Sequence, residues 1–140
     1  MAAKTTQSMH DFLNYALRNV SPSWGGSGTL YLSLHTNAVG VGGDQTTNEV
    51  AYTTYARIAV TRSSGGGWTA AAAGSSSNNV LLQFGNCTAG GPVTVSHIAL
   101  GENSSSTGTV IYTGALASSL VINTNVQPQF SIGALVITEA

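Results

Sequence analysis

The spacing of apolar residues divides the chain into a short helical part and a long part made of strands. Near the N-terminus, apolar residues recur every three or four positions, as on one face of an α-helix; they are Met9, Phe12, Leu13, Ala16, Leu17 and Val20. Ser8 is a suitable N-cap, and Asn19 followed by Ser21-Pro22 ends the pattern. Because so short a helix is not stable alone in water, its apolar face is expected to pack on the β domain, with another subunit as the alternative.

From Thr29 the apolar spacing changes to every second residue, which is typical of strands. Residues 29–36 alternate cleanly, with Leu30, Leu32 and Leu34 on the buried side and His35 on the outward side. Seven further strands are expected over residues 57–62, 68–72, 79–84, 93–100, 109–113, 120–124 and 134–138. Gly-, Ser- and Asn-rich turns separate them, and no helical pattern lies between them, which excludes parallel βαβ units.

Eight short strands predict an all-β fold, an eight-stranded jelly-roll-like β-sandwich preceded by one short amphipathic helix. We expect residues 1–28 to form an N-terminal arm, the helix and a Gly/Ser linker, and residues 29–140 to form the sandwich domain. A long Gly-containing loop, residues 37–48, interrupts the strands. Loops of this length in a small domain are usually functional or disordered.

Composition changes the picture mainly through charge. Hydrophobic residues make up 42% of the chain, but charged residues make up only 6%, whereas typical soluble domains have about a quarter. With a formal net charge of −1, such a surface loses little when water is removed from it, which favours a permanent assembly. A charge-poor secreted β domain is the alternative. The four basic residues are too scattered to form a phosphate-binding stripe, so nucleic acid is not an expected partner.

No catalytic or metal-binding pattern is present in the sequence. The three histidines lack ligand spacing, the Gly-rich runs match no phosphate-binding or nucleophile motif, and the five carboxylates form no obvious pair. The lone Cys87 has no basic neighbour and is expected to be an inert thiol without a disulfide. No apolar run is long enough to span a membrane or to act as a signal peptide, so we expect the protein to be cytoplasmic when it is made. The sequence thus predicts a protein that is not an enzyme and has no cofactor.

Several short motifs, taken in order, resemble a known family. They are Leu32-Ser33-Leu34-His35-Thr36, Thr47-Asn48-Glu49-Val50-Ala51-Tyr52, Tyr55-Ala56-Arg57 and Gly67-Trp68-Thr69. This order is similar to that of small structural proteins of tailed bacteriophages, which are often labelled tail fibre proteins. The length, the N-terminal helix and the expected jelly roll are also similar to cement proteins that decorate phage heads. Neither resemblance implies catalytic residues.

Three functions remain open at this level. The first is a capsid cement (decoration) protein on the outer surface of the phage head, a dimer or trimer that binds the major capsid protein and stabilises the shell. The second is a tail-associated protein, either part of a fibre or baseplate or a receptor-binding tip. The third is a carbohydrate-binding jelly roll, with Tyr31, Tyr52 or Tyr112 as aromatic platforms. The expected partner-binding residues lie on the helix and in the long loop: Met9, Phe12, Leu13, Leu17, Asn37, Val39, Val41 and Asp44.

Overall fold

The computed structural model describes residues 3–139 and confirms the predicted fold class, an all-β sandwich with a short N-terminal helix. Within those residues the order of elements is α1 (Thr6–Arg18), β1 (Thr29–His35), β2 (Ile58–Thr61), β3 (Ser75–Ser77), β4 (Leu82–Gln83), β5 (Val93–Gly101), β6 (Val110–Ile122), β7 (Gln129–Phe130) and β8 (Val136–Thr138). Residues 1 and 2 of the expected N-terminal arm lie outside the described range.

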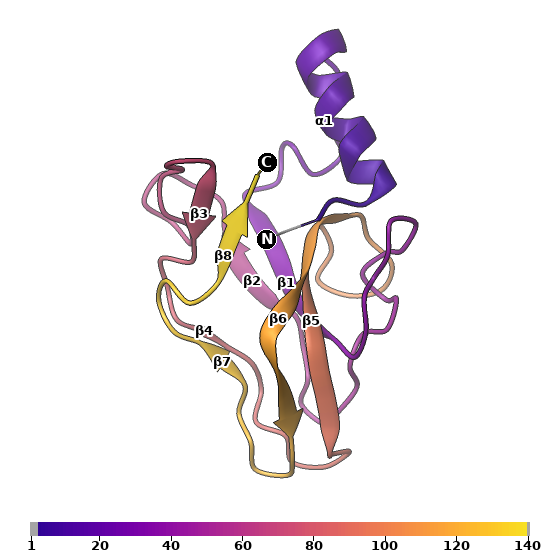
Figure 1. The fold of residues 1–140 in the computed structure, drawn as a ribbon, viewed down its shortest axis with the longest axis vertical. Helices are drawn as coiled ribbons and strands as arrows, with labels where there is room; N and C mark the ends of the chain where they lie inside the picture. Colours follow the sequence, from indigo (N-terminus) through magenta and orange to yellow (C-terminus); the bar gives the residue numbers. More distant parts are fainter. Residues whose placement is uncertain (1–2, 140) are drawn as a thin grey trace.

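Two layers enclose the core (Figure 1). One is a four-stranded antiparallel sheet in the order β2-β1-β5-β6, and the other consists of the antiparallel pairs β3-β8 and β4-β7. Leu32 and Leu34 of β1 are fully buried and belong to one cluster with Leu82 and Phe84 of the second layer. The predicted inward face of the first strand is therefore confirmed.

The outer face of β1 is also covered, which the sequence did not predict. His35 was expected to face outward, but both Ser33 and His35 are completely buried. The long loop crosses this face of the sheet, where Val39 packs with Ala99 and Val110 in a second apolar cluster. The prediction for His35 was wrong because alternation shows which residues share a face, but not whether a loop covers that face.

Some strand boundaries differ from the predictions, because hydrogen-bonded pairing with a neighbouring strand decides them and the local apolar spacing does not. The predicted strands 109–113 and 120–124 form one strand, β6, whose pairing with β5 is irregular after Val95. The predicted strand 68–72 is absent as a strand; the serines of β3 form one instead, paired with β8. The short strand β7 was not predicted.

Helix α1 begins earlier than predicted. Its N-cap is Thr5, whose Oγ1 accepts a hydrogen bond from the backbone N–H of Ser8 at 3.3 Å. Ser8 lies inside the first turn, so its prediction as the cap was wrong. At the other end Asn19 adopts a left-handed conformation with φ of 54°, and the Val20 N–H donates to the Asn14 carbonyl at 3.2 Å. This confirms the predicted end of the helix.

Candidate interaction surface

Helix α1 is fixed to the sandwich by its polar residues. The Thr5 and Ser8 hydroxyls donate to the backbone carbonyls of Val110 (2.7 Å) and Ile111 (2.9 Å), at the start of β6. The buried carboxylate of Asp11 accepts a hydrogen bond from Trp24 Nε1 at 2.8 Å. These hydrogen bonds attach the polar side of α1 to the sandwich. They do not involve the apolar face of the helix.

Phe12 is the apolar residue that completes this junction. Its ring centroid lies 5.3 Å from that of Trp24 and 6.2 Å from that of Tyr112, and Lys4 Nζ lies 4.6 Å from its centre. Phe12 was expected to bind a partner, but it is half-buried within the protein's own aromatic cluster. Its first role is to hold α1 in place.

The remaining apolar residues of α1 face solvent. We call them the α1 stripe: Met9, Leu13, Ala16 and Leu17, all of which are exposed. Leu13 is 57% exposed and Leu17 is 78% exposed. At 100° per residue the stripe is centred about a third of a turn from Ser8, so it points away from β6. The expectation that this face packs on the β domain is confirmed for Phe12 alone and wrong for the rest of the face, because hydrogen bonds at Thr5, Ser8 and Asp11 set the rotation of the helix.

The long loop meets the beginning of the helix. The Thr6 N–H donates to the Val41 carbonyl at 2.7 Å, and the Val41 side chain is 65% exposed. An open groove lies alongside, lined by residues 3–4 of the arm, residues 38–41 of the loop and Thr113–Ala115 of β6. The helix and the loop, which the sequence predicted as separate binding elements, thus form one continuous region.

The other expected loop residues have different positions. Val39 lies in the second apolar cluster and is buried, so it supports the loop and does not face a partner. Asn37 is exposed, and its Oδ1 accepts from the Ala38 N–H. Asp44 Oδ1 accepts hydrogen bonds from the Thr46 hydroxyl (2.6 Å) and N–H (2.7 Å), which lower the pKa of the carboxyl group.

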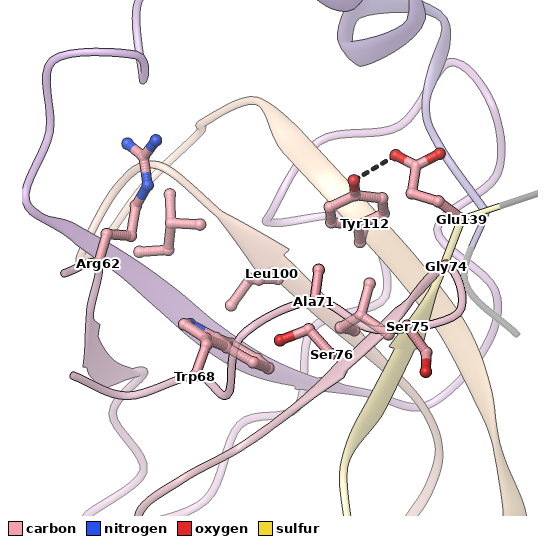
Figure 2. Close-up of a pocket in the computed structure, with 11 residues that line it drawn as sticks. Arg62, Trp68, Ala71, Gly74, Ser75, Ser76, Leu100, Tyr112 and Glu139 are labelled. Atoms are coloured by element: carbon pink, nitrogen blue, oxygen red, sulfur yellow. Dashed lines mark hydrogen bonds between the residues drawn. The ribbon is translucent and has the colours of Figure 1, made fainter. Parts of the chain in front are cut away.

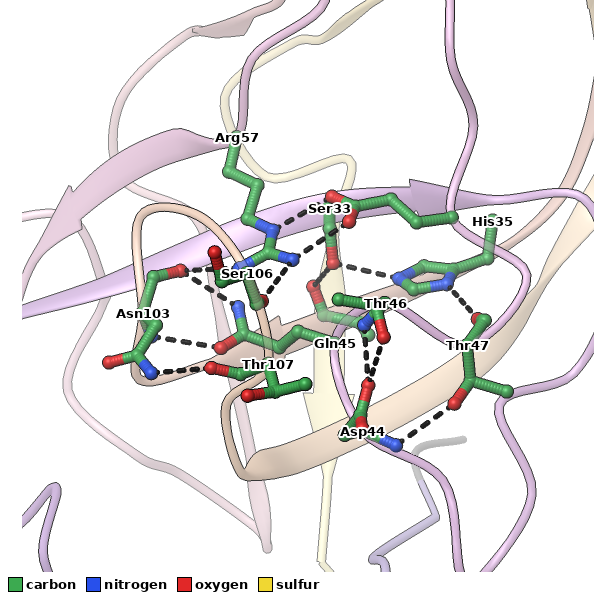
Figure 3. Close-up of polar contacts among 12 residues, drawn as sticks. Ser33, His35, Asp44, Gln45, Thr46, Thr47, Arg57, Asn103, Ser106 and Thr107 are labelled. Carbon is green, nitrogen blue, oxygen red and sulfur yellow. Dashed lines mark hydrogen bonds and ion pairs between the residues drawn. The ribbon is translucent and has the colours of Figure 1, made fainter.

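Beneath the loop, polar side chains form a closed network (Figure 3). Arg57 donates to both carboxylate oxygens of Glu49, at 2.7 Å each, and its side chain is only 3% exposed. Gln45, fully buried, exchanges hydrogen bonds with the backbone of Asn103 at 2.8 and 3.1 Å. These contacts hold the loop against the turn before β6. The Thr-Asn-Glu-Val and Tyr-Ala-Arg motifs thus supply the Glu49–Arg57 pair.

The same network contains a serine and a histidine in contact. Ser33 Oγ lies 2.8 Å from His35 Nε2, and His35 Nδ1 lies 2.8 Å from the Thr47 carbonyl. This arrangement has the spacing of a nucleophile and its base. However, both side chains are fully buried, and desolvation lowers the pKa of His35. With no exposed surface for a substrate to reach, the pair ties the loop to β1. Sequence analysis missed the contact between His35 and Thr47 because it forms only when the long loop folds back onto β1.

A cavity of about 320 Å³ opens between the four-stranded sheet and the β3-β8 pair (Figure 2). Trp68 lines its apolar part, and Arg62 lies at one end, where it donates to two backbone carbonyls of the segment after α1. At the other end the Tyr112 hydroxyl donates to Glu139, whose second oxygen lies 2.6 Å from Lys4 Nζ. Burial and this hydrogen bond raise the pKa of Tyr112. Among the described residues, Glu139 is the only carboxylate that lines the cavity, and it is already paired.

Other sequence-level candidates are dispersed. Tyr52 belongs to the core, whereas Tyr112 lines the cavity and Tyr31 lies on β1, so the three tyrosines do not form one platform. Cys87 is completely buried. Among residues 3–139, no three His, Cys, Asp or Glu side chains are grouped as metal ligands. Over the same range, no helix has the length and apolar character needed to cross a membrane.

Comparison with protein-family models gives a match over nearly the whole chain. A family model described as "Podophage GP4 fiber I protein gp80" matches residues 3–138. No curated protein matches the sequence.

Proposed function

The chain belongs to the Podophage GP4 fiber I protein gp80 family, and on that premise we propose that it is a structural component of the phage tail, of the fibre type. The family is one of phage structural proteins, so the chain is a virion protein. Sequence analysis favoured a cement protein on the head, with the tail as the alternative. The description of the family as a fibre protein supports the tail-associated alternative better.

The observation that carries a structural role is the uncovered α1 stripe. A free monomer rarely leaves a row of large apolar side chains in water, and such a row marks an interaction site. Met9, Leu13 and Leu17 all lie in it, as expected from the sequence, and Val41 is exposed on the loop that contacts the beginning of α1. We therefore place the attachment surface on α1 and the adjoining tip of the loop.

The proposal also holds that the protein is not an enzyme. Supporting this, Ser33 and His35 are enclosed, and Glu49 is bound by Arg57. Glu139 is likewise engaged by Lys4 and Tyr112. The side chains with possible chemistry are thus used in holding the loop and the chain ends in place.

Copy number and position in the virion test the tail assignment. Quantitative mass spectrometry of purified virions, calibrated against the major capsid protein, should give tens of copies or fewer. Antibody-gold labelling in electron micrographs should mark the tail. Hundreds of copies with label over the head would overturn the tail assignment and restore the cement hypothesis.

Substitutions in the α1 stripe test whether this surface attaches the protein to the virion. Leu13→Ser with Leu17→Ser should remove the protein from virions without unfolding it, because both side chains are exposed. Deletion of residues 1–19 is a poorer test, since it would also uncover Trp24 and Tyr112 beneath Phe12. Virions that incorporate the double variant at the normal level would place the attachment surface elsewhere.

A further inference from the structure

The α1 stripe has the spacing of a helix-to-helix seam. Met9, Leu13 and Ala16 are separated by four and three residues, which is the alternation of core positions in a coiled coil. Leu17 lies beside this seam and widens it. The mean repeat of about 3.5 residues keeps these side chains on one line along a partner helix. A second helix with the same spacing would fit this line.

The charges of α1 leave the seam neutral. Its only carboxylate, Asp11, faces the body and accepts from Trp24. Arg18 lies nearly opposite the middle of the stripe on the helical wheel, and its Nη1 donates to Asn14. Two identical stripes can therefore meet with no like charges facing each other and without removing water from an ion. This favours a second copy as the occupant.

The second half of the helix has little else to hold it. Figure 1 shows α1 projecting from the sandwich, and its buried residues, Ser8 and Asp11, both lie in its first half. A helix of 13 residues is marginal in water without packing. A partner on the stripe would supply that packing to the turns after Phe12.

We propose that the α1 stripe packs against the α1 stripe of a second copy of this chain, so that the protein assembles through a bundle of its N-terminal helices. This inference rests on the proposed structural role, because it names the partner of the same surface. It is tested on the purified full-length protein alone, so its failure is separate from a failure of the tail assignment.

The first test measures self-association by sedimentation velocity over a series of protein concentrations. The wild-type protein should form a defined oligomer, and the fitted mass gives the number of copies. Leu13→Ser and Leu17→Ser should each weaken association by about tenfold or more, because each removes a leucine from an apolar contact. Ile132→Ser is the matched control, since Ile132 is also exposed (66%) but lies in the turn between β7 and β8; it should leave association unchanged.

The second test locates the contact by disulfide cross-linking. Leu13 is in the middle of the stripe, so Leu13→Cys would lie near its own counterpart whether the helices run parallel or antiparallel. Under mild oxidation this variant should form covalent dimers much faster than Arg18→Cys, which places the thiol on the other side of α1. The native Cys87 is fully buried and should not react in the folded protein.

Three outcomes would overturn the inference. They are a wild-type protein that stays monomeric at the highest concentration, equal cross-linking of the two cysteine variants, and association that survives both serine substitutions. A purified tail protein that binds the stripe of a monomeric chain would assign the surface to that partner instead. Circular dichroism and thermal unfolding of each variant ensure that lost association does not reflect lost folding.

Discussion

At the scale of single residues, burial decided the roles of the reactive side chains. Ser33 and His35 stand two apart on β1 and touch at 2.8 Å, yet neither has any exposed surface. Their sequence positions predicted that they share a face, but not that the long loop would cover it. Val39, in the same loop, was expected to contact a partner, but it is buried in the second apolar cluster. A buried neutral imidazole has a consequence for stability.

We predict that stability falls as the pH drops below 6.5 and that His35 is the cause. Burial lowers the pKa of His35 from its ordinary value of 6.5. Between that value and the lower folded-state pKa, the unfolded chain binds a proton that the folded protein does not, so acid favours unfolding. The loss can reach about 1.4 kcal/mol per pH unit in that interval.

Urea unfolding at a series of pH values between about 7.5 and about 5.5 measures this slope. The carboxyl groups whose pKa is lowered in the folded protein are Asp44, Glu102 and Glu139. Their ordinary values of 3.8, 4.5 and 4.5 lie below this window, so they contribute little to the slope within it. In His35→Gln the slope should disappear, although the variant is less stable overall. A slope that persists in His35→Gln would assign the effect to another group.

At the scale of elements, the helix and strands β1 and β5 were predictable, whereas the very short strands β3 and β7 were not, and the longest strand, β6, was predicted as two. Apolar spacing located α1, β1 and β5 because each carries enough side chains to show a period. The two residues of β7 and the three serines of β3 have no such signal, and they are strands only because β4 and β8 pair with them. The helix was located correctly, but its rotation depends on the three polar contacts to its body-facing side.

We predict that Thr5 contributes more to α1 than its neighbour Thr6. Thr5→Ala removes the N-cap and leaves the buried Val110 carbonyl without its hydroxyl donor, which should cost about 1–2 kcal/mol in the free energy of unfolding. Amide exchange over residues 8–12 should also accelerate. Thr6→Ala is the control at an exposed site and should change stability by about 0.5 kcal/mol or less. Equal effects of the two substitutions would contradict the capping role.

At the scale of the whole molecule, the scarcity of charge acquires a structural meaning. Four of the nine charged residues form the pairs Lys4–Glu139 and Arg57–Glu49 within the chain, and Asp11 accepts a hydrogen bond from Trp24. The proposed contact between copies therefore depends mainly on apolar surface. This leads to a prediction about salt.

Self-association through the α1 stripe should be nearly independent of ionic strength. Raising NaCl from about 0.05 M to about 0.5 M should change the association constant by less than about twofold, because screening acts on charges and the stripe has none. Ammonium sulfate should strengthen association, as it strengthens apolar burial. Sedimentation at each salt concentration measures both effects. A steep weakening in NaCl would show instead that charged groups such as Arg18 or Asp44 form the contact.

The sequence by itself determined the fold class, the amphipathic helix, the inward face of β1 and the scarcity of charge. Periodicity and composition determine these properties locally, since each follows from side chains a few positions apart. Only the tertiary structure decided which side of α1 faces the body, which loop covers His35 and where β3 and β7 find partners. Each of those depends on contacts between segments distant in the chain, such as Ser8 with Ile111, whose free energies no local pattern records. The apolar face of α1 was therefore predictable, but its exposure was not.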